Sequence, residues 1–275
     1  MIRIHPIQTG TVVVHERQRD GIGRGPARLV RTLADRRWTE PLPILAWAIE
    51  HPEGLIVVDA GETARATEPG YFPAWNPYFR FALRLNVEPA DEIGPGLERL
   101  GLKPRDVRRV VLTHLHTDHA GGLAHLRHGE HVVTRTELAF ASGAKGRARG
   151  YVNQHWPSWF HPAGVEFDGP AFGPFERSLP LTEAGDVVLL PTPGHTPGHA
   201  SVAVRTEGRI VLLAGDTSYS QQLMVDDAVD GVTQDPATLR RTLGLIRALA
   251  ASEPTVYLPS HDPDSAARLA ALEPV

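Results

Sequence analysis

The sequence predicts a protein of the α/β class, and three observations support this. Short apolar runs rich in β-branched residues are typical of buried strands. Amphipathic stretches with capping signals lie between these runs and indicate helices. Residues able to bind metals follow several of the predicted strands directly. The chain of 275 residues could form one large domain or two small ones. We expect one domain over residues 1–275, because no linker or low-complexity segment divides the chain.

The first half of the chain is predicted to begin with strands. A pair of strands around Gly10 is expected within 2–14, where the pattern alternates and then becomes continuously apolar. Two later runs form a hairpin across Pro52–Gly54. A helix over about 91–100 has an apolar face and Gly101 as a plausible stop. The other elements predicted in this half are strands at 44–49, 55–58, 110–113 and 131–134 and a helix start at 136–140.

The second half is predicted to continue with strands that run straight into polar turns. Asp235 and Pro236 open a helix as its N-cap and first residue, and an apolar stripe follows them. A short helix from about 263 closes the chain. The strands predicted here lie at 187–190, 201–204, 210–213 and 255–258.

Two segments have no assigned role. Residues 15–37 are strongly charged, and we expect a solvated excursion there. The alternative is a phosphate-binding loop within Asp20–Pro26, which no strand–turn–helix context supports. Residues 143–164 are rich in glycine, arginine and aromatic residues and stay unassigned.

An aromatic insertion is predicted at about 62–89. Its stretch Tyr71–Phe81 is the most aromatic in the chain, and the prolines argue against a regular element at its start. It either caps the core locally or offers apolar surface to a partner or ligand. In the second case we expect a roof over the substrate pocket or a symmetric contact in a homodimer, because a large apolar patch seldom stays exposed.

The composition excludes several kinds of site and partner. The net charge of −4 gives no reason to expect nucleic acid or an anionic membrane as partner. The chain has no cysteine, so any metal must be held by histidine and carboxylate side chains. No apolar run has the length of a signal-peptide core or a membrane span, so we expect a cytoplasmic protein.

The stretch His114–Gly122, with the sequence HLHTDHAGG, is the strongest candidate site. It follows a predicted buried strand, so His114 and His116 point the same way from an extended end and can share one metal. Asp118 and His119 lie where the next helix begins and can reach a second metal. Zinc and similar cations favour imidazole and carboxylate ligands. The alternative is a polar turn that happens to be rich in histidine, and the ligand-type residues downstream argue against it.

Three later strands also run into residues that can bind metals. His195 and His199 follow the first of these strands, Asp216 the second and His261 the third. Sites of this kind form where the ends of several strands converge. One such histidine would more often be structural, but three strand ends in this order favour a site.

This series of motifs resembles the ligand series of the metallo-β-lactamase superfamily, from the strands near 44–59 to the last histidine. The resemblance implies an αββα sandwich of two mixed sheets flanked by helices. His199 matches no ligand position, and we interpret it as a support for the ligands or as a structural residue. We interpret Asp59 and Asp262 as hydrogen-bonding supports rather than ligands. The resemblance implies one metal bound by His114, His116 and His195, a second bound by Asp118, His119 and His261, and Asp216 as the bridge.

The resemblance also implies a chemistry. The two divalent metals would be zinc, or else iron, manganese or cobalt. Two neighbouring metals imply a hydrolase in which both metals bind one hydroxide. Tyr219, three residues after Asp216, resembles a tyrosine of the N-acyl-homoserine lactonases that hydrogen-bonds the substrate carbonyl. The bridging hydroxide would attack the lactone carbonyl, Tyr219 would stabilise the oxyanion, and Asp118 would move the proton. This reaction opens N-acyl-homoserine lactones and is known as quorum quenching.

Other functions fit the same motifs. A thioesterase of the glyoxalase II type, a phosphodiesterase or a lactonase for another ring would use a similar centre. A mono-iron oxidoreductase of the persulfide dioxygenase kind is a further alternative, and counting metals would separate it. A binding protein without chemistry is disfavoured by the complete ligand set. For the substrate pocket we predict Tyr71, Phe72, Trp156, Trp159, Leu223 and Met224.

Overall fold

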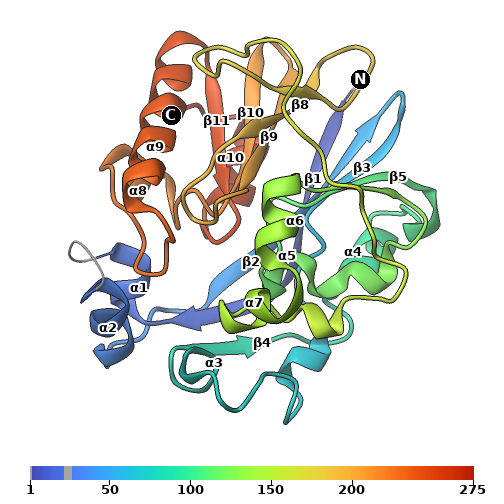
Figure 1. Ribbon diagram of the computed structural model, residues 1–275. Coiled ribbons are helices and arrows are strands. Elements are labelled where there is room, and N and C mark those ends of the chain that lie inside the picture. Colours follow the sequence, from blue (N-terminus) through green and yellow to red (C-terminus); the bar gives the residue numbers. More distant parts are fainter. Residues whose placement is uncertain (1, 22–26) are drawn as a thin grey trace.

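Two β-sheets packed face to face form the centre of the protein, and helices cover the outer faces (Figure 1). The structure is a computed structural model that describes residues 2–21 and 27–275. The layers run helix, sheet, sheet, helix, and each sheet contains both parallel and antiparallel pairs. The predicted αββα sandwich is therefore confirmed.

The first sheet has six strands in the order β4-β1-β2-β3-β5-β6. The pairs β3–β5 and β5–β6 are parallel, and the other pairs are antiparallel. The hairpin predicted across Pro52–Gly54 joins β2 and β3. The strands are β1 (Arg3–Val14), β2 (Leu42–His51), β3 (Gly54–Val58), β4 (Leu83–Asn86), β5 (Val107–Val111) and β6 (Glu130–Val132).

The prediction of two strands around Gly10 is wrong, because β1 is a single bent strand. Its register against β2 shifts between Gln8 and Thr11, and Gly10 lies in this interval with a φ of 129°. A Cβ at Gly10 would lie 2.7 Å from Val87 Cγ2. The glycine therefore allows a bulge and a close backbone approach, not a hairpin turn.

The second sheet has five strands in the order β11-β10-β9-β8-β7. The pair β10–β11 is parallel and the others are antiparallel. All four strands predicted in the second half are present, and β7 was not predicted. The strands are β7 (Leu179–Pro180), β8 (Val187–Pro191), β9 (Ala200–Thr206), β10 (Arg209–Gly215) and β11 (Thr255–Pro259).

The longest helix of the described residues, α9, begins as its sequence predicts. The Asp235 carboxylate accepts hydrogen bonds of 3.0 Å from the backbone N–H groups of Ala237 and Thr238, and Pro236 takes the first helical position. No described helix is both long and apolar enough to cross a membrane. The helices are α1 (Glu16–Asp20), α2 (Ala27–Ala34), α3 (Pro77–Phe81), α4 (Ile93–Arg99), α5 (Thr117–Ala120), α6 (Arg135–Ala141), α7 (Gly143–Ala148), α8 (Gln221–Val225), α9 (Pro236–Ser252) and α10 (Ser265–Ala271).

Three apolar layers hold the sandwich together. Alternate residues of a strand face opposite sides of its sheet, so Trp47 of β2 packs between the sheets and Ala48 packs on the outer face. Leu97 of α4 covers that outer face. Leu243 of α9 packs against Leu212 on the outer face of the second sheet. Because both faces of each sheet are buried, the strands have fixed positions. The loops at the strand ends are therefore also fixed in position.

The prediction that residues 15–37 form a solvated excursion is wrong for the described part. This segment forms α1 and α2, and Gln18, Arg28 and Thr32 are buried. The backbone N–H of Gly231 donates a 2.6 Å hydrogen bond to the Gln18 carbonyl, so α1 packs against the loop before α9. The alternative phosphate-binding loop within Asp20–Pro26 falls largely on residues 22–26, outside the described residues.

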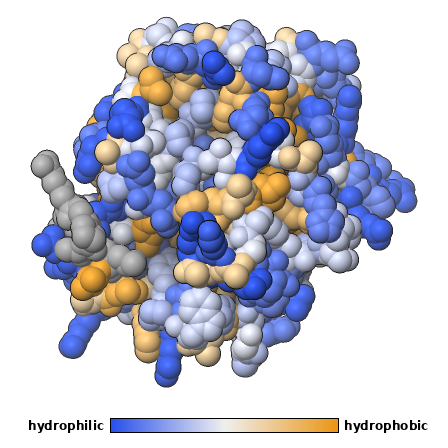
Figure 2. Space-filling view, viewed as in Figure 1, coloured by the Kyte–Doolittle hydropathy of each residue, from blue (hydrophilic) through white to orange (hydrophobic). Residues whose placement is uncertain are grey.

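The aromatic segment 62–89 contains more regular structure than predicted. It includes a 3₁₀ turn, α3 and the edge strand β4. Most of its aromatic residues pack locally, while Trp75 and Phe81 are 62% and 55% exposed. Hydrophobic residues form only small groups among hydrophilic ones on the face shown in Figure 2. A homodimer and a cytoplasmic location stay predictions.

Candidate metal centre

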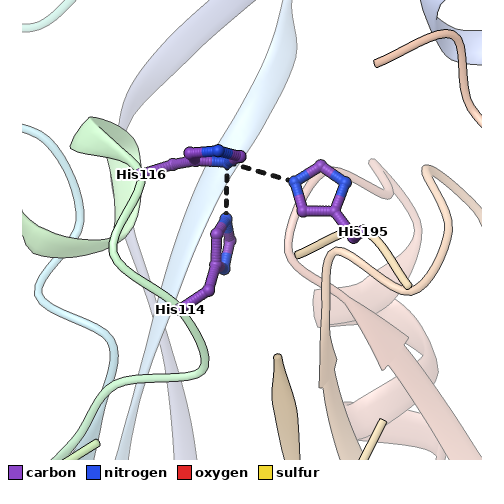
Figure 3. Close-up of side chains that lie close together, drawn as sticks. All are labelled: His114, His116 and His195. Atoms are coloured by element: carbon purple, nitrogen blue, oxygen red, sulfur yellow. Dashed lines mark hydrogen bonds between the residues drawn. The ribbon is translucent and has the colours of Figure 1, made fainter. Parts of the chain in front are cut away.

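Three histidines converge from two loops at the ends of strands (Figure 3). His114 and His116 lie between β5 and α5, and His195 lies on the turn after β8. His116 Nδ1 is 2.9 Å from His114 Nε2 and 3.1 Å from His195 Nε2. Their ring nitrogens point toward a common space, so the three side chains can bind one ion.

A second group lies beside the first. Asp118 and His119 belong to the first turn of α5, and His261 follows β11. Asp118 Oδ1 is 3.9 Å from His119 Nε2, and its Oδ2 is 3.4 Å from His261 Nε2. These three side chains also offer atoms close enough to share one ion.

Asp216, which directly follows β10, lies between the two groups and faces each with a different oxygen. Its Oδ2 is 3.5 Å from His195 Nε2 and 3.9 Å from His114 Nε2. Its Oδ1 is 3.2 Å from His119 Nε2 and 3.5 Å from His261 Nε2. One carboxylate could therefore contribute an oxygen to each group. The structure thus brings together all seven residues that the sequence singled out.

These donors fit divalent cations. Zinc binds imidazole nitrogen and carboxylate oxygen at roughly 2.0–2.2 Å, which places the ligand atoms of a tetrahedral site roughly 3.4 Å apart. The separations between donors run from 2.9 to 3.9 Å. Among the described residues, His119 Nε2 and Asp216 Oδ1 are buried without a hydrogen-bond partner. Buried polar atoms normally have partners, and a bound cation would supply one for each.

The charges within the group differ. Burial lowers the pKa of His119, His195 and His261, but nearby carboxylates outweigh it and raise the pKa of each, whereas other candidate ligands are in the form that suits a cation. Burial lowers the pKa of His116 to about 3 and holds the pKa of His114 well below its usual value, so both imidazoles are neutral. Burial raises the pKa of Asp118, but the neighbouring His119 and His261 outweigh it and lower the pKa to about 2. Neutral imidazoles and ionised carboxylates are the forms that bind metals.

Asp59 holds His119 in place. Its Oδ2 lies 2.8 Å from His119 Nδ1 and accepts a 2.9 Å hydrogen bond from the Thr113 hydroxyl. Asp59 has a φ of 62°, an uncommon backbone conformation that aspartate tolerates better than most residues. The carboxylate therefore fixes the His119 ring with Nε2 toward the centre, as predicted for a support.

Other candidate ligands have supports of the same kind. His261 Nδ1 is 2.8 Å from the Pro43 carbonyl oxygen, and His195 Nδ1 is 3.4 Å from Asp230 Oδ2. His199 Nε2 accepts a 3.0 Å hydrogen bond from the backbone N–H of Asp216, which agrees with a supporting role. Asp230 was not predicted, because it follows no strand and belongs to no motif.

Glu137 joins the two loops that carry the first group. Its carboxylate accepts hydrogen bonds from the Leu115 backbone N–H at 3.1 Å, the Thr196 hydroxyl at 2.6 Å and the Tyr151 hydroxyl at 2.9 Å. Burial raises the pKa of Glu137. One carboxylate thus fixes the spacing between the β5–α5 loop and the turn that carries His195.

We expect the variant Asp59→Asn to bind metal roughly tenfold or more weakly, because losing a support of this kind typically costs 10–100-fold. An amide cannot stabilise the His119 ring as a carboxylate does. Competition with a chelator would measure the affinity. The control is Asp186→Asn, which changes a comparable Asp–His contact, the one with His51. Asp186 lies just before β8, whereas His195 follows the opposite end of this strand. Equal affinities in the two variants would contradict a supporting role for Asp59.

A cavity of about 550 Å³ opens on this centre, a size typical of small-molecule sites. His116, Asp118, His195, Asp216 and His261 lie in its wall. Apolar side chains of β1 and β4 form another part of the wall, and polar side chains from α1, α2 and the loop before α9 complete it. The wall also includes Gln18, Arg28, Tyr78, Tyr219 and Gln234.

Tyr219 lies in this cavity, beside the centre. Its ring stacks on His261 with the ring centroids 5.5 Å apart, and its hydroxyl accepts a 2.9 Å hydrogen bond from Gln18 Nε2. The same amide nitrogen is 2.8 Å from the Tyr78 hydroxyl. Burial raises the pKa of Tyr219 well above its usual value. The phenol therefore keeps its proton, which it can donate to a ligand.

The six residues predicted for the substrate pocket do not line this cavity. Met224 is completely buried in the core on the outer face of the second sheet, and Leu223 packs beside Tyr219. The others pack locally: Tyr71 stacks on His155 and Phe72 on Phe79, and the two tryptophans pack against the core of the first sheet. The prediction is wrong because apolar character does not distinguish core from cavity. The aromatic segment still contributes Tyr78 and Phe79 to the wall, which agrees with its role as a roof.

Gln18 and Arg28 are cavity residues that the sequence did not reveal. Both lie in a charged segment with no motif, and no local pattern distinguishes a polar residue in a cavity wall from one in solvent.

Comparison with known proteins identifies the family. The family model described as metallo-beta-lactamase superfamily matches residues 39–261. The chain is 28% identical over 236 residues to N-acyl homoserine lactonase AttM of Rhizobium radiobacter, covering 82% of this chain and 83% of that protein. It is 35% identical over 197 residues to the probable metallo-hydrolase Rv2300c of Mycobacterium tuberculosis, covering 70% of this chain and 60% of the relative.

A solved structure confirms the fold. It is described as an N-acyl homoserine lactone hydrolase with the product N-hexanoyl-L-homoserine at the catalytic metal centre. The TM-score is 0.75 at 22% identity, covering 95% of this chain and 93% of that one. The predictions of the superfamily and of a metal-dependent hydrolase are confirmed by these comparisons. The chain belongs to the metallo-beta-lactamase superfamily.

Proposed function

We propose that this protein is a two-metal lactonase that opens the ring of N-acyl-homoserine lactones. The relative from Rhizobium radiobacter bears the name of such a lactonase. The observation that carries the proposal is the position of Tyr219, whose hydroxyl lies in the wall of the cavity that opens on the metal centre. It supplies a hydrogen-bond donor beside the centre, as hydrolysis of a carbonyl compound requires.

Two divalent ions held by the seven ligands would supply a hydroxide nucleophile near neutral pH and polarise the carbonyl oxygen. Tyr219 would donate its hydrogen bond to this oxygen as negative charge develops there. Gln18 orients the phenol by donating to its oxygen, which directs the phenol proton toward another acceptor. The Asp59 and Glu137 contacts keep the ligands from rearranging.

Ring opening forms a bond between the carbonyl carbon and the entering oxygen and breaks the bond from that carbon to the ring oxygen. The ring oxygen must then receive a proton. Asp118 is placed to carry it from the nucleophile, because its carboxylate lies in the cavity wall beside His261. The products would be a carboxylate and the free hydroxyl of the opened ring.

A substrate panel tests the proposal. Protein of known metal content would be assayed on N-acyl-homoserine lactones, other lactones, thioesters such as S-lactoylglutathione, and phosphodiesters. We expect the highest kcat/KM on the acyl-homoserine lactones. A higher value on a thioester or phosphodiester would assign the centre to that reaction instead. Activity only on a lactone with another ring would support a lactonase but would assign it a different substrate.

A further inference from the structure

A second phenol, that of Tyr78, shares the cavity wall with Tyr219. Tyr78 belongs to α3 in the aromatic segment and is partly exposed, whereas Tyr219 is only 7% exposed. Gln18 Nε2 donates a 2.8 Å hydrogen bond to the Tyr78 hydroxyl and a 2.9 Å hydrogen bond to the Tyr219 hydroxyl. One amide group therefore holds two phenol oxygens near each other, and the ring of one phenol stacks on His261 beside the metal centre.

The two phenols are both hydrogen-bond donors. A hydroxyl oxygen that accepts a hydrogen bond still carries a proton, which it can donate to another acceptor. Among the described residues, both hydroxyls accept from Gln18 and neither donates to a group of the protein. Burial raises the pKa of Tyr78 as it raises that of Tyr219, so both phenols keep their protons. A ligand in the cavity can therefore accept a hydrogen bond from each.

The spacing of the two phenols fits a ligand with two neighbouring carbonyl groups. Each phenol oxygen lies within 2.9 Å of the same nitrogen atom, so the two oxygens are close together. In an N-acyl-homoserine lactone, only the ring Cα and the amide nitrogen separate the lactone carbonyl carbon from the amide carbonyl carbon. With the lactone carbonyl at Tyr219, the amide carbonyl is the neighbouring acceptor for Tyr78.

The wall next to Tyr78 suits the chain that follows such an amide. Phe79, whose ring centroid lies 5.6 Å from that of Tyr78, also lines the cavity. Phe79 and Leu85 pack against one apolar cluster, and Leu85 also packs against the cluster that contains Val12. Leu85 and Val12 line the cavity as well. The wall thus passes from a phenol donor to apolar side chains, as an acyl chain passes from its amide to its alkyl part.

We propose that Tyr78 donates a hydrogen bond to the amide carbonyl oxygen of the substrate and so selects lactones that carry an acylamino group. The inference rests on the proposed lactonase function, because it concerns the substrate of the same cavity. Tyr78 determines specificity, while Tyr219 and the metals act on the lactone carbonyl. A lactone with a plain alkyl chain in the same position offers Tyr78 no acceptor.

The test compares an N-acyl-homoserine lactone with an alkyl lactone, which has the same ring and a chain of equal length but no amide. Tyr78→Phe should lower kcat/KM on the acylamino lactone roughly tenfold and leave that on the alkyl lactone unchanged. An indirect effect on Tyr219 through Gln18 would lower both values alike, so the ratio of the two isolates the amide contact. Equal changes on both substrates, or no change on the acylamino lactone, would overturn the proposal.

Two other tyrosines give the controls. Tyr71→Phe makes the same change in the aromatic segment at a residue that does not line the cavity, and it should leave both substrates unaffected. Tyr219→Phe should lower kcat/KM on both substrates, because both contain the lactone carbonyl.

Failure of this proposal can be distinguished from failure of the proposed function. A parent enzyme that opens the alkyl lactone but not the acylamino lactone would still be a lactonase, and the proposal for Tyr78 would be overturned. If neither lactone is opened, the proposed function fails, and the intact lactones then serve as ligands in calorimetry on metal-loaded protein. Tyr78→Phe should weaken binding of the acylamino lactone roughly tenfold without affecting the alkyl lactone. Equal changes, or no binding of the acylamino lactone to the parent, would overturn the proposal.

Discussion

Replacing Asp216 with alanine is expected to lower kcat/KM on lactones by roughly 10³-fold or more and to reduce the bound metal at both positions. The two oxygens of Asp216 face different groups of ligands, so one substitution takes a ligand from each ion. Charge stabilisation by metals contributes several kcal/mol to catalysis, and each factor of ten corresponds to about 1.4 kcal/mol. Elemental analysis and steady-state kinetics would measure both effects.

The matched control is Asp226→Ala, which makes the same chemical change at an exposed position beyond the centre. It should retain the metal content and activity of the parent. Circular dichroism would establish that both variants fold. A variant at Asp216 that keeps both ions and its activity would show that this carboxylate is no bridge.

Replacing Tyr219 with phenylalanine is expected to lower kcat/KM on acyl-homoserine lactones by roughly 10²-fold, the lower part of the range for losing one oxyanion donor. The metals would still polarise the same oxygen, which limits the loss. The ring and its stacking on His261 are kept, so folding and metal content should stay unchanged. Kinetics at matched metal content would measure the effect.

Tyr71→Phe is the control for this variant. It removes a phenol hydroxyl from a buried tyrosine that does not line the cavity, and it should leave kcat/KM close to the parent's. If Tyr219→Phe is as active as this control, Tyr219 only packs against His261. The two-metal hydrolase would then stand without an assigned substrate.

The candidate metal ligands could be predicted from the sequence because they follow strands that bury both faces. An apolar run such as Ile210–Leu213 predicts a buried strand, and the strand ends where the apolar residues end. His195, Asp216 and His261 each follow such a run closely. Their convergence then depends only on how the strands pair, and the family resemblance implied that arrangement.

The wall of the cavity could not be predicted in the same way. Gln18 and Arg28 are polar residues of a charged segment, and such segments are exposed more often than buried. Gln18 is buried through contacts with Tyr219 and with Gly231 of the loop before α9, both more than 200 positions away in the sequence. Conversely, Trp156 and Trp159 are apolar residues that could lie in a pocket or in a core. Only the tertiary packing determines which of the two locations they occupy. Local patterns therefore find ligands more readily than cavity walls.

The bend of β1 shows a similar ambiguity. Glycine at position 10 allows a turn or a bulge with equal ease, and only the pairing with β2 and β4 distinguishes the two. The short edge strand β4 was also missed, because its four residues follow an aromatic segment with no regular pattern.

The metal content of the protein, purified without chelators, tests the two-metal centre most directly. Elemental analysis of each preparation, paired with its lactonase activity, would give the number and kind of ions per chain. We predict two divalent ions per chain and an activity that rises with their occupancy. A single iron per chain in fully active protein would contradict the two-metal centre, and a single iron in protein without lactonase activity would favour an oxygenase.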